Sequence, residues 1–238
     1  MGGGSYLLCC FPRSCRDMTY SPSTNGKLPD TMPIFPLEGA VLLPGGELPL
    51  NIFERRYLAM VDAALGQGRW IGMVQPRQNQ GDKEDGIQTL FSIGCAGQIS
   101  SFSATKDNRY FITLTGACRF SITTELEQAD GFRRIKPDFT AFEDDLEPEP
   151  LDTRQRADLF RALKDYLGWS GYDADWDALE NAPDPALVAS MAMACPFAPA
   201  EKQALLEASS LVPRTRCLVT MLDMARHDEA ETVDHARH

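Results

Sequence analysis

Histidine, a residue that many catalytic and metal sites need, is scarce in this 238-residue sequence. All three copies, His227, His235 and His238, lie in the C-terminal tail. A Ser-His-Asp or Cys-His set needs a histidine held inside the folded core, so hydrolases of those kinds are disfavoured. The G-x-x-x-x-G-K-[ST] string that cradles nucleotide phosphates in ATPases is also missing. We therefore expect a protein that is not an enzyme and that needs no cofactor.

Basic residues and long apolar runs are scarce too. The chain has 23 basic and 34 acidic residues, and its net charge of −11 repels a phosphate backbone. The densest basic group, at 133–136, is typical of a solvated strand edge. No apolar run is long enough to span a membrane, and the burst at 6–11 is too short and wrongly flanked for a signal peptide. The sequence predicts a cytoplasmic protein without nucleic-acid or membrane partners.

The seven cysteines follow no framework spacing. An odd number without a CxxC pair favours reduced thiols in the cytosol. Cys9, Cys10 and Cys15 are close in sequence, but no histidine accompanies them, so a zinc site is disfavoured. We expect no metal.

The most informative stretch is residues 32–57, MPIFPLEGAVLLPGGELPLNIFERRY. Proline fixes φ and withholds an N–H, so residues 33–35 and 48–50 are predicted to be strands that are edge-like or interrupted. The prolines concerned are Pro33, Pro36, Pro44 and Pro49.

The second half of this stretch predicts a turn and then a helix. Gly45-Gly46 would let residues 40–43 run beside residues 47–52. The apolar spacing then changes to a helical period, which predicts a helix over 54–66.

The next segment has the pattern of a sheet. Residues 70–74 form a continuous apolar run that is typical of a central strand, and the polar residues 75–87 predict a surface loop. A strand region over 89–105, a turn at Asp107-Asn108 and a strand at 110–114 predict a hairpin. Further strands are expected at 116–122 and 132–142.

Several of these strings resemble one family. PIFPL, LLPG and LPLNIFERRY, followed by IGCAGQI and DNRYFITLTGACRF, closely resemble the N-terminal substrate-binding domain of Lon proteases, here in a stand-alone form without the ATPase and protease modules. The resemblance implies an α+β fold, with a PUA-like β-rich pseudo-barrel, one inserted helix and a C-terminal helical bundle. Residues of the shared motifs are given structural roles: Pro36, Leu37, Pro44, Pro49, Glu54, Arg56, Gly116, Arg119 and Phe120.

The expected organisation has five parts. They are a disordered lead (1–31), the β-rich domain (32–142), an acidic linker (143–152), a helical subdomain (153–227) and a disordered tail (228–238). Within the helical subdomain the caps and apolar stripes predict four short helices, starting near Thr153, Ala186, Pro199 and Pro213. Gly168 is expected to end the first of them.

Candidate binding residues are aromatic. Phe35, Phe53, Tyr57 and Trp70 are mostly core by type, although one or two of them could line a groove. Catalysis by Glu54 and Arg56 is disfavoured, because acidic residues in the first turn of a helix usually stabilise the helix through its dipole.

Arg119 is expected to pair with a carboxylate such as Glu54 and to lock two β elements together. Normal stability with lost partner binding in Arg119→Ala would overturn that interpretation.

The main functional hypothesis is a non-catalytic protein- or peptide-binding module that acts as an adaptor in protein quality control. Its partners would be polypeptide clients or a protease or chaperone, and its oligomeric state stays open. The alternative is a small-molecule sensor or carrier with a pocket between sheet and helices. RNA binding is a third hypothesis, weakened by the acidic charge.

Overall fold

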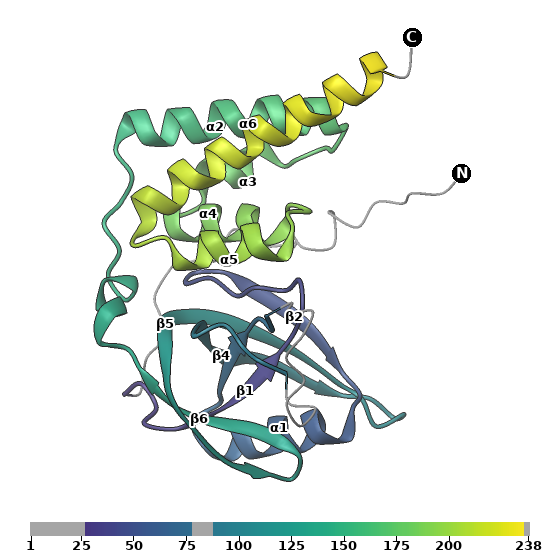
Figure 1. Cartoon of the computed structure of the whole chain (residues 1–238), viewed down its shortest axis with the longest axis vertical. Coiled ribbons are helices and arrows are strands. Elements are labelled where there is room, and N and C mark those ends of the chain that lie inside the picture. The colour runs from purple at the N-terminus through teal and green to yellow at the C-terminus, as the bar shows by residue number, and fades with distance from the viewer. Residues whose placement is uncertain (1–26, 78–87, 236–238) are drawn as a thin grey trace.

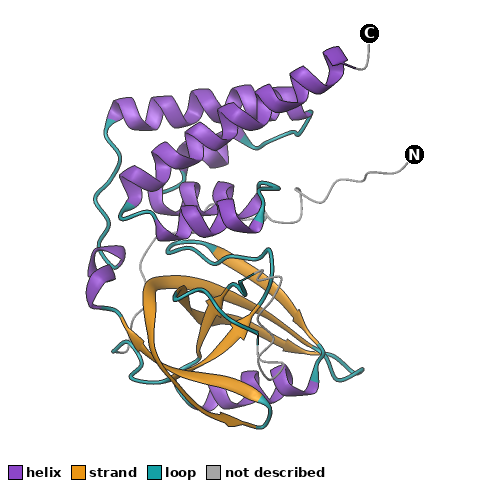
Figure 2. Ribbon diagram, in the orientation of Figure 1, coloured by secondary structure: helices purple, strands orange, loops and turns teal. Residues whose placement is uncertain are grey.

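The computed structural model describes residues 27–77 and 88–235, with side chains as far as Arg226. A β part with one helix occupies one end, and a layer of helices covers the other (Figure 1; Figure 2). The strands are β1 (Met32–Pro36), β2 (Glu47–Ile52), β3 (Trp70–Val74), β4 (Ile93–Ala104), β5 (Tyr110–Ala129) and β6 (Phe132–Asp138). The helices are α1 (Arg55–Gly66), the 3₁₀ helix η3 (Thr140–Asp145), α2 (Thr153–Ser170), α3 (Trp176–Asn181), α4 (Asp184–Ala194), α5 (Pro199–Glu207) and α6 (Leu211–His235).

Five of the strands close into a ring, as the expected pseudo-barrel requires. The order β5-β4-β3-β1-β6 returns to β5, because β5 pairs with β4 along its first half and with β6 along its second. β1 and β3 run parallel, and β2 adds to the first half of β5 outside the ring. The long strand β5 therefore holds the barrel closed.

The proline-containing strand β1 is interior. Residues 33–35 were expected to be edge-like or interrupted, and the edge-like alternative was wrong. β1 lies between β3 and β6, but the two ladders overlap only at Ile34. Pro33 pairs only with β6 and Pro36 pairs only with β3. Neither proline therefore has to pair with strands on both of its sides, which would require the N–H that proline lacks. β2, which contains Pro49, pairs with β5 and with no other described strand, as expected of an edge.

The turn before β2 forms, but residues 40–43 do not run beside β2 as a strand. The Gly46 N–H donates to the Leu43 carbonyl at 2.9 Å, which closes the turn. Residues 41–43 are instead buried against the barrel. A Cβ at Gly116 would lie 2.1 Å from the Leu43 oxygen, so only glycine lets the two backbones approach this closely.

The β4–β5 hairpin forms with Asn108 in the left-handed region at φ 56°. Beyond it, the strands expected at 110–114 and 116–122 are one unbroken strand, β5. The last strand ends at Asp138, and the residues expected to extend it to 142 enter η3.

The helical part has more helix than expected. A capping box between Asp152 and Gln155 starts α2, which continues past Gly168 to Ser170 and has Gly171 (φ 70°) as its C-cap. The short helix α3 was not predicted. α6 continues beyond the expected end at His227.

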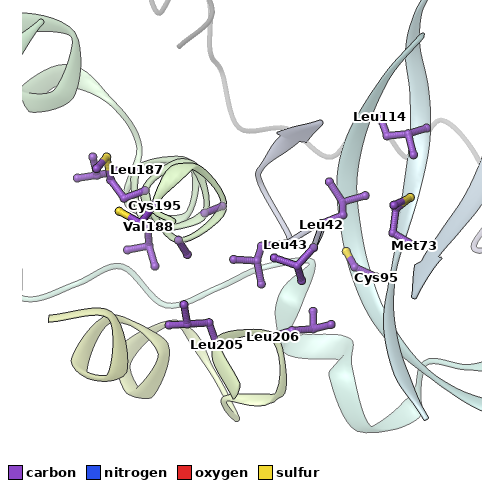
Figure 3. Close-up of a cluster of buried hydrophobic side chains, with 14 of the residues drawn as sticks. Leu42, Leu43, Met73, Cys95, Leu114, Leu187, Val188, Cys195, Leu205 and Leu206 are labelled. Carbon is purple, nitrogen blue, oxygen red and sulfur yellow. The ribbon is translucent and has the colours of Figure 1, made fainter. Parts of the chain in front are cut away.

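One hydrophobic core runs through both parts. Leu42 and Leu43 lie between side chains of the barrel and those of α4 and α5 (Figure 3). The labelled neighbours are Met73, Cys95 and Leu114 in the barrel, and Leu187, Val188, Cys195, Leu205 and Leu206 on the helical side. The barrel and the helices therefore share a continuous apolar interior.

Candidate functional site

Three of the four candidate binding aromatics lie in the core. Phe35, Tyr57 and Trp70 have 6 %, 8 % and 4 % of their surface exposed, and the rings of Phe35 and Tyr57 pack at 4.4 Å between centroids. Phe53 is different, with 63 % exposed at the end of β2. The fold thus leaves Phe53 as the only one of the four on the surface.

Glu54 and Arg56 pair with each other at the start of α1. The Arg56 Nε donates to Glu54 Oε2 at 3.0 Å, and the guanidinium lies over the Tyr57 ring. Both charged side chains are about half exposed, so the pair contributes little to stability. Arg119 does pair with a carboxylate, as expected, but that carboxylate is not Glu54.

Arg119 instead pairs with Asp145, the last residue of η3. Its backbone N–H and Nε donate to Asp145 Oδ2 at 2.9 and 2.7 Å, and Nη2 donates to Oδ1 at 2.8 Å. The two side chains are 1 % and 5 % exposed. The bidentate geometry is the strong form of this interaction.

The other guanidinium hydrogens reach the helical part. Nη1 donates to the carbonyls of Leu206 (3.2 Å) and Ala208, and Nη2 donates to the carbonyl of Ser209 (2.9 Å). One barrel side chain therefore joins β5, the last residue of η3 and the α5–α6 turn, which gives Arg119 a structural role.

The remaining motif residues also serve the fold. The Leu37 N–H donates to the Val74 carbonyl at 3.1 Å directly after β1. Phe120 is fully buried, and a Cβ at Gly72 or Gly94 would come within 3.0 Å of its ring. Pro44 is buried in the turn before β2.

The described cysteines are not activated. Burial raises the pKa of Cys118 to about 12 and that of Cys195 to about 12, and it places the pKa of Cys95 well above its ordinary value. These thiols stay protonated at neutral pH, whereas a nucleophile or metal ligand must lose its proton. Cys9, Cys10 and Cys15 lie outside the described residues. Within the part of the chain that the structure describes, no group of His, Cys, Asp and Glu is arranged to hold a metal ion.

A groove of about 600 Å³ lies on the helical part, between the C-terminal end of α2, the turn before α5, and α6. We call it the aromatic groove. Its lining residues are Tyr166, Trp169, Ser170, Tyr172, Pro196, Phe197, Glu201, Met221, Met224 and Ala225.

The aromatic groove exposes large apolar side chains beside polar ones. Trp169, Tyr172 and Met224 have 41 %, 37 % and 56 % of their surface exposed, so large apolar side chains face solvent. Aromatic rings bring much contact area at a low entropic cost, and methionine adapts to irregular shapes. The volume is in the range of ligand-binding clefts.

Sequence reasoning missed this groove because α2 was expected to stop at Gly168. Trp169 and Tyr172 then had no assigned place. The available signal was an aromatic pair at the helix end, together with Met221 and Met224 three residues apart on α6.

A smaller cavity of about 350 Å³ lies where the acidic linker (143–152) meets the start of α6. Its walls include Pro44 from the barrel side and Leu211 from the helical side. Four acidic residues, Asp144, Asp145, Glu147 and Glu149, line it together with one basic residue, Arg214, so the lining is acidic on balance.

A family comparison matches residues 31–224 to the model of the ATP-dependent protease La (LON) substrate-binding domain. The chain belongs to this LON substrate-binding domain family. The α+β architecture and the closed barrel are therefore those expected from the Lon resemblance.

The curated relatives that match this chain include several Lon proteases. Lon protease 2 of Myxococcus xanthus is 25 % identical over 84 % of this chain, and Lon protease of Anaeromyxobacter dehalogenans is 26 % identical over 84 %. Lon protease of Escherichia coli K12 is 24 % identical over 81 %. In each case the match covers 24 % of the relative, so the chain spans about a quarter of their length.

Solved structures of LON domains share the fold. A Lon N-terminal domain protein from Xanthomonas campestris superposes with a TM-score of 0.58, at 20 % identity, over 80 % of this chain and 97 % of that one. The N-terminal domain of Mycobacterium avium complex Lon protease gives 0.57, at 17 % identity, over 81 % and 98 %. None of the described helices of this chain has the length and hydropathy needed to cross a membrane.

Proposed function

We propose that this LON domain is a cytoplasmic, non-catalytic module that binds polypeptide clients in the aromatic groove and acts as an adaptor in protein quality control. The observation that carries the proposal is the groove itself, where Trp169, Tyr172 and Met224 remain exposed on an otherwise well-packed helical layer. Large exposed apolar side chains that gather in one concave place mark an interaction site.

The family supports a polypeptide as the ligand. The matching model describes substrate binding within an ATP-dependent protease, and the relatives are proteases whose substrates are proteins. A groove lined by aromatic and methionine side chains fits apolar segments of varied shape, since methionine can repack around each of them. Such segments are exposed in unfolded proteins and buried in folded ones.

Binding without chemistry agrees with the state of the side chains. Among the described residues, the buried thiols have raised pKa values and so lack nucleophilic character. The buried ion pair of Arg119 and Asp145 is occupied in joining the two parts of the fold.

The experiment is a fluorescence anisotropy titration of a labelled, reduced and alkylated model protein with the full chain. Trp169→Gln and Met224→Gln shorten or replace exposed groove side chains and leave the core intact. The matched control is Phe53→Gln, which removes a still more exposed aromatic side chain from the barrel part.

We expect Trp169→Gln to weaken binding by tenfold or more. The side chain exposes 41 %, or on the order of 100 Å² of ring surface, which corresponds to roughly 2 kcal/mol if the client covers it. The control should bind normally. Lost binding in Phe53→Gln with normal binding in Trp169→Gln would move the site to the barrel, and no binding by the unchanged protein would remove the proposal.

The smaller acidic cavity supports a second candidate function, a small-molecule sensor. It lies at the junction of the barrel side and the helices, and its carboxylates favour a cationic ligand. A thermal-shift screen against polyamines and neutral metabolites tests this candidate, and the absence of any shift would dismiss it.

A further inference from the structure

The aromatic groove has a charge character as well as an apolar one. Glu201 is the one charged residue in its lining. Asp173 follows the lining residue Tyr172 directly and is exposed. Both carboxylates also serve local backbone groups, since Glu201 Oε2 accepts from the Ala198 N–H at 2.7 Å and Asp173 Oδ1 accepts from the Ala174 N–H at 3.0 Å.

The nearby cations are already engaged elsewhere. Arg161 pairs with Asp165 and Asp223, and Arg226 pairs with Asp165 at 3.1 Å. Lys202, the neighbour of Glu201 in sequence, donates to two backbone carbonyls at 3.2 and 3.3 Å. Within the described part of the chain, no basic side chain forms an ion pair with Glu201 or Asp173.

The Glu201 carboxylate also affects the pKa of a neighbouring side chain. The pKa of the half-buried Cys217 thiol is raised, first by burial and then by the Glu201 carboxylate. Cys217 lies one helical turn before the groove residue Met221 on α6. The Glu201 carboxylate therefore places a negative charge in the lining of the groove.

We propose that the aromatic groove selects apolar polypeptide segments that carry lysine or arginine beside their aromatic or aliphatic residues, and discriminates against acidic ones. This inference rests on the proposed function and adds the class of client. The apolar walls take the hydrophobic side chains, while Glu201 and Asp173 attract the flanking cation. The overall charge of −11 acts in the same direction over longer range.

The test uses three labelled peptides with one apolar sequence, flanked by lysine, by glutamine or by glutamate. We expect the lysine peptide to bind about threefold to tenfold more tightly than the glutamine peptide, and the glutamate peptide to bind more weakly than both, since each exposed pair is worth only a few-fold in affinity. Added salt should reduce the difference between the peptides and leave binding of the glutamine peptide nearly unchanged.

Two variants assign the preference to the groove. Glu201→Gln keeps an oxygen for the Ala198 N–H, and Asp173→Asn keeps one for Ala174, so both should fold normally. Together they should abolish most of the preference for lysine. The matched control, Glu127→Gln on the exposed second half of β5, should retain it.

The outcomes separate this inference from the proposed function. If the three peptides bind equally and Trp169→Gln weakens all of them, the groove binds polypeptide but the charge preference is refuted. A preference for the lysine peptide that survives in Glu201→Gln/Asp173→Asn also refutes it. If no peptide binds to the unchanged protein, the proposed function itself fails.

Discussion

Removing the Asp145 carboxylate should destabilise the whole chain, because the Arg119 guanidinium would stay buried without its counter-charge. Asp145→Asn keeps the size of the side chain but replaces one of the two acceptor oxygens with an NH₂ group. That NH₂ group would then face a guanidinium N–H of Arg119, which is also a donor. Truncating one partner of a buried pair costs about 3–5 kcal/mol. That is a large share of the roughly 5–15 kcal/mol that holds a typical domain together.

A double-mutant cycle measured by urea denaturation tests the reasoning. Arg119→Met should cost a similar amount, because it strands the carboxylate and the carbonyls of 206, 208 and 209. Arg119→Met/Asp145→Leu should lose about 2 kcal/mol less than the sum of the single variants, since an apolar pair leaves no buried charge. Hydrogen exchange should increase first in the α5–α6 turn.

Glu54→Gln is the matched control for this cycle. Glu54 forms an ion pair with arginine as Asp145 does, but that pair is about half exposed. It should shift stability by less than about 0.5 kcal/mol. A change below about 1 kcal/mol in Asp145→Asn, or additive single effects, would refute the claim that this pair joins barrel and helices.

Two further predictions concern glycine and thiols. Gly116→Ala should lower the melting temperature strongly, because the added Cβ would lie 2.1 Å from the Leu43 oxygen. Gly168→Ala should instead stabilise the protein by about 0.5–1 kcal/mol, because Gly168 lies inside α2 with open space around it. Equal effects of the two substitutions in thermal denaturation would contradict both predictions. The free energy of unfolding should fall as the pH rises above about 9, because thiols in the unfolded chain ionise near their ordinary pKa, whereas Cys118 and Cys195 in the folded protein have pKa values of about 12. The expected slope is about 1.4 kcal/mol per pH unit for each thiol. A free energy of unfolding that stays constant from pH 9 to 11 in urea denaturation would refute this prediction.

Local patterns predicted the local elements well. The helix start near Thr153, the turn at Asp107-Asn108 and the helix after β2 depend on neighbours in sequence, and each was predicted from its own residues. β1 was misjudged, because prolines Pro33 and Pro36 suggest an edge unless the staggered partners are known.

The long-range partnerships could not be read from local patterns. Asp145 lies in a run of acidic and proline residues that is typical of a solvated linker, and nothing in that run marks the one carboxylate that reaches Arg119. The aromatic groove is likewise assembled from three separated segments. Trp169 in α2, Phe197 in the turn before α5 and Met224 in α6 become neighbours only through the packing of the helical part.

The most direct measurement of the central claim is site-specific photo-crosslinking with an unfolded client protein. A photoreactive phenylalanine analogue would replace Tyr172 in the aromatic groove or Phe53 on the barrel, in the full chain. The account predicts client crosslinks from position 172 that an apolar, lysine-flanked peptide competes away, and none above background from position 53. Crosslinks from position 53 alone would contradict it.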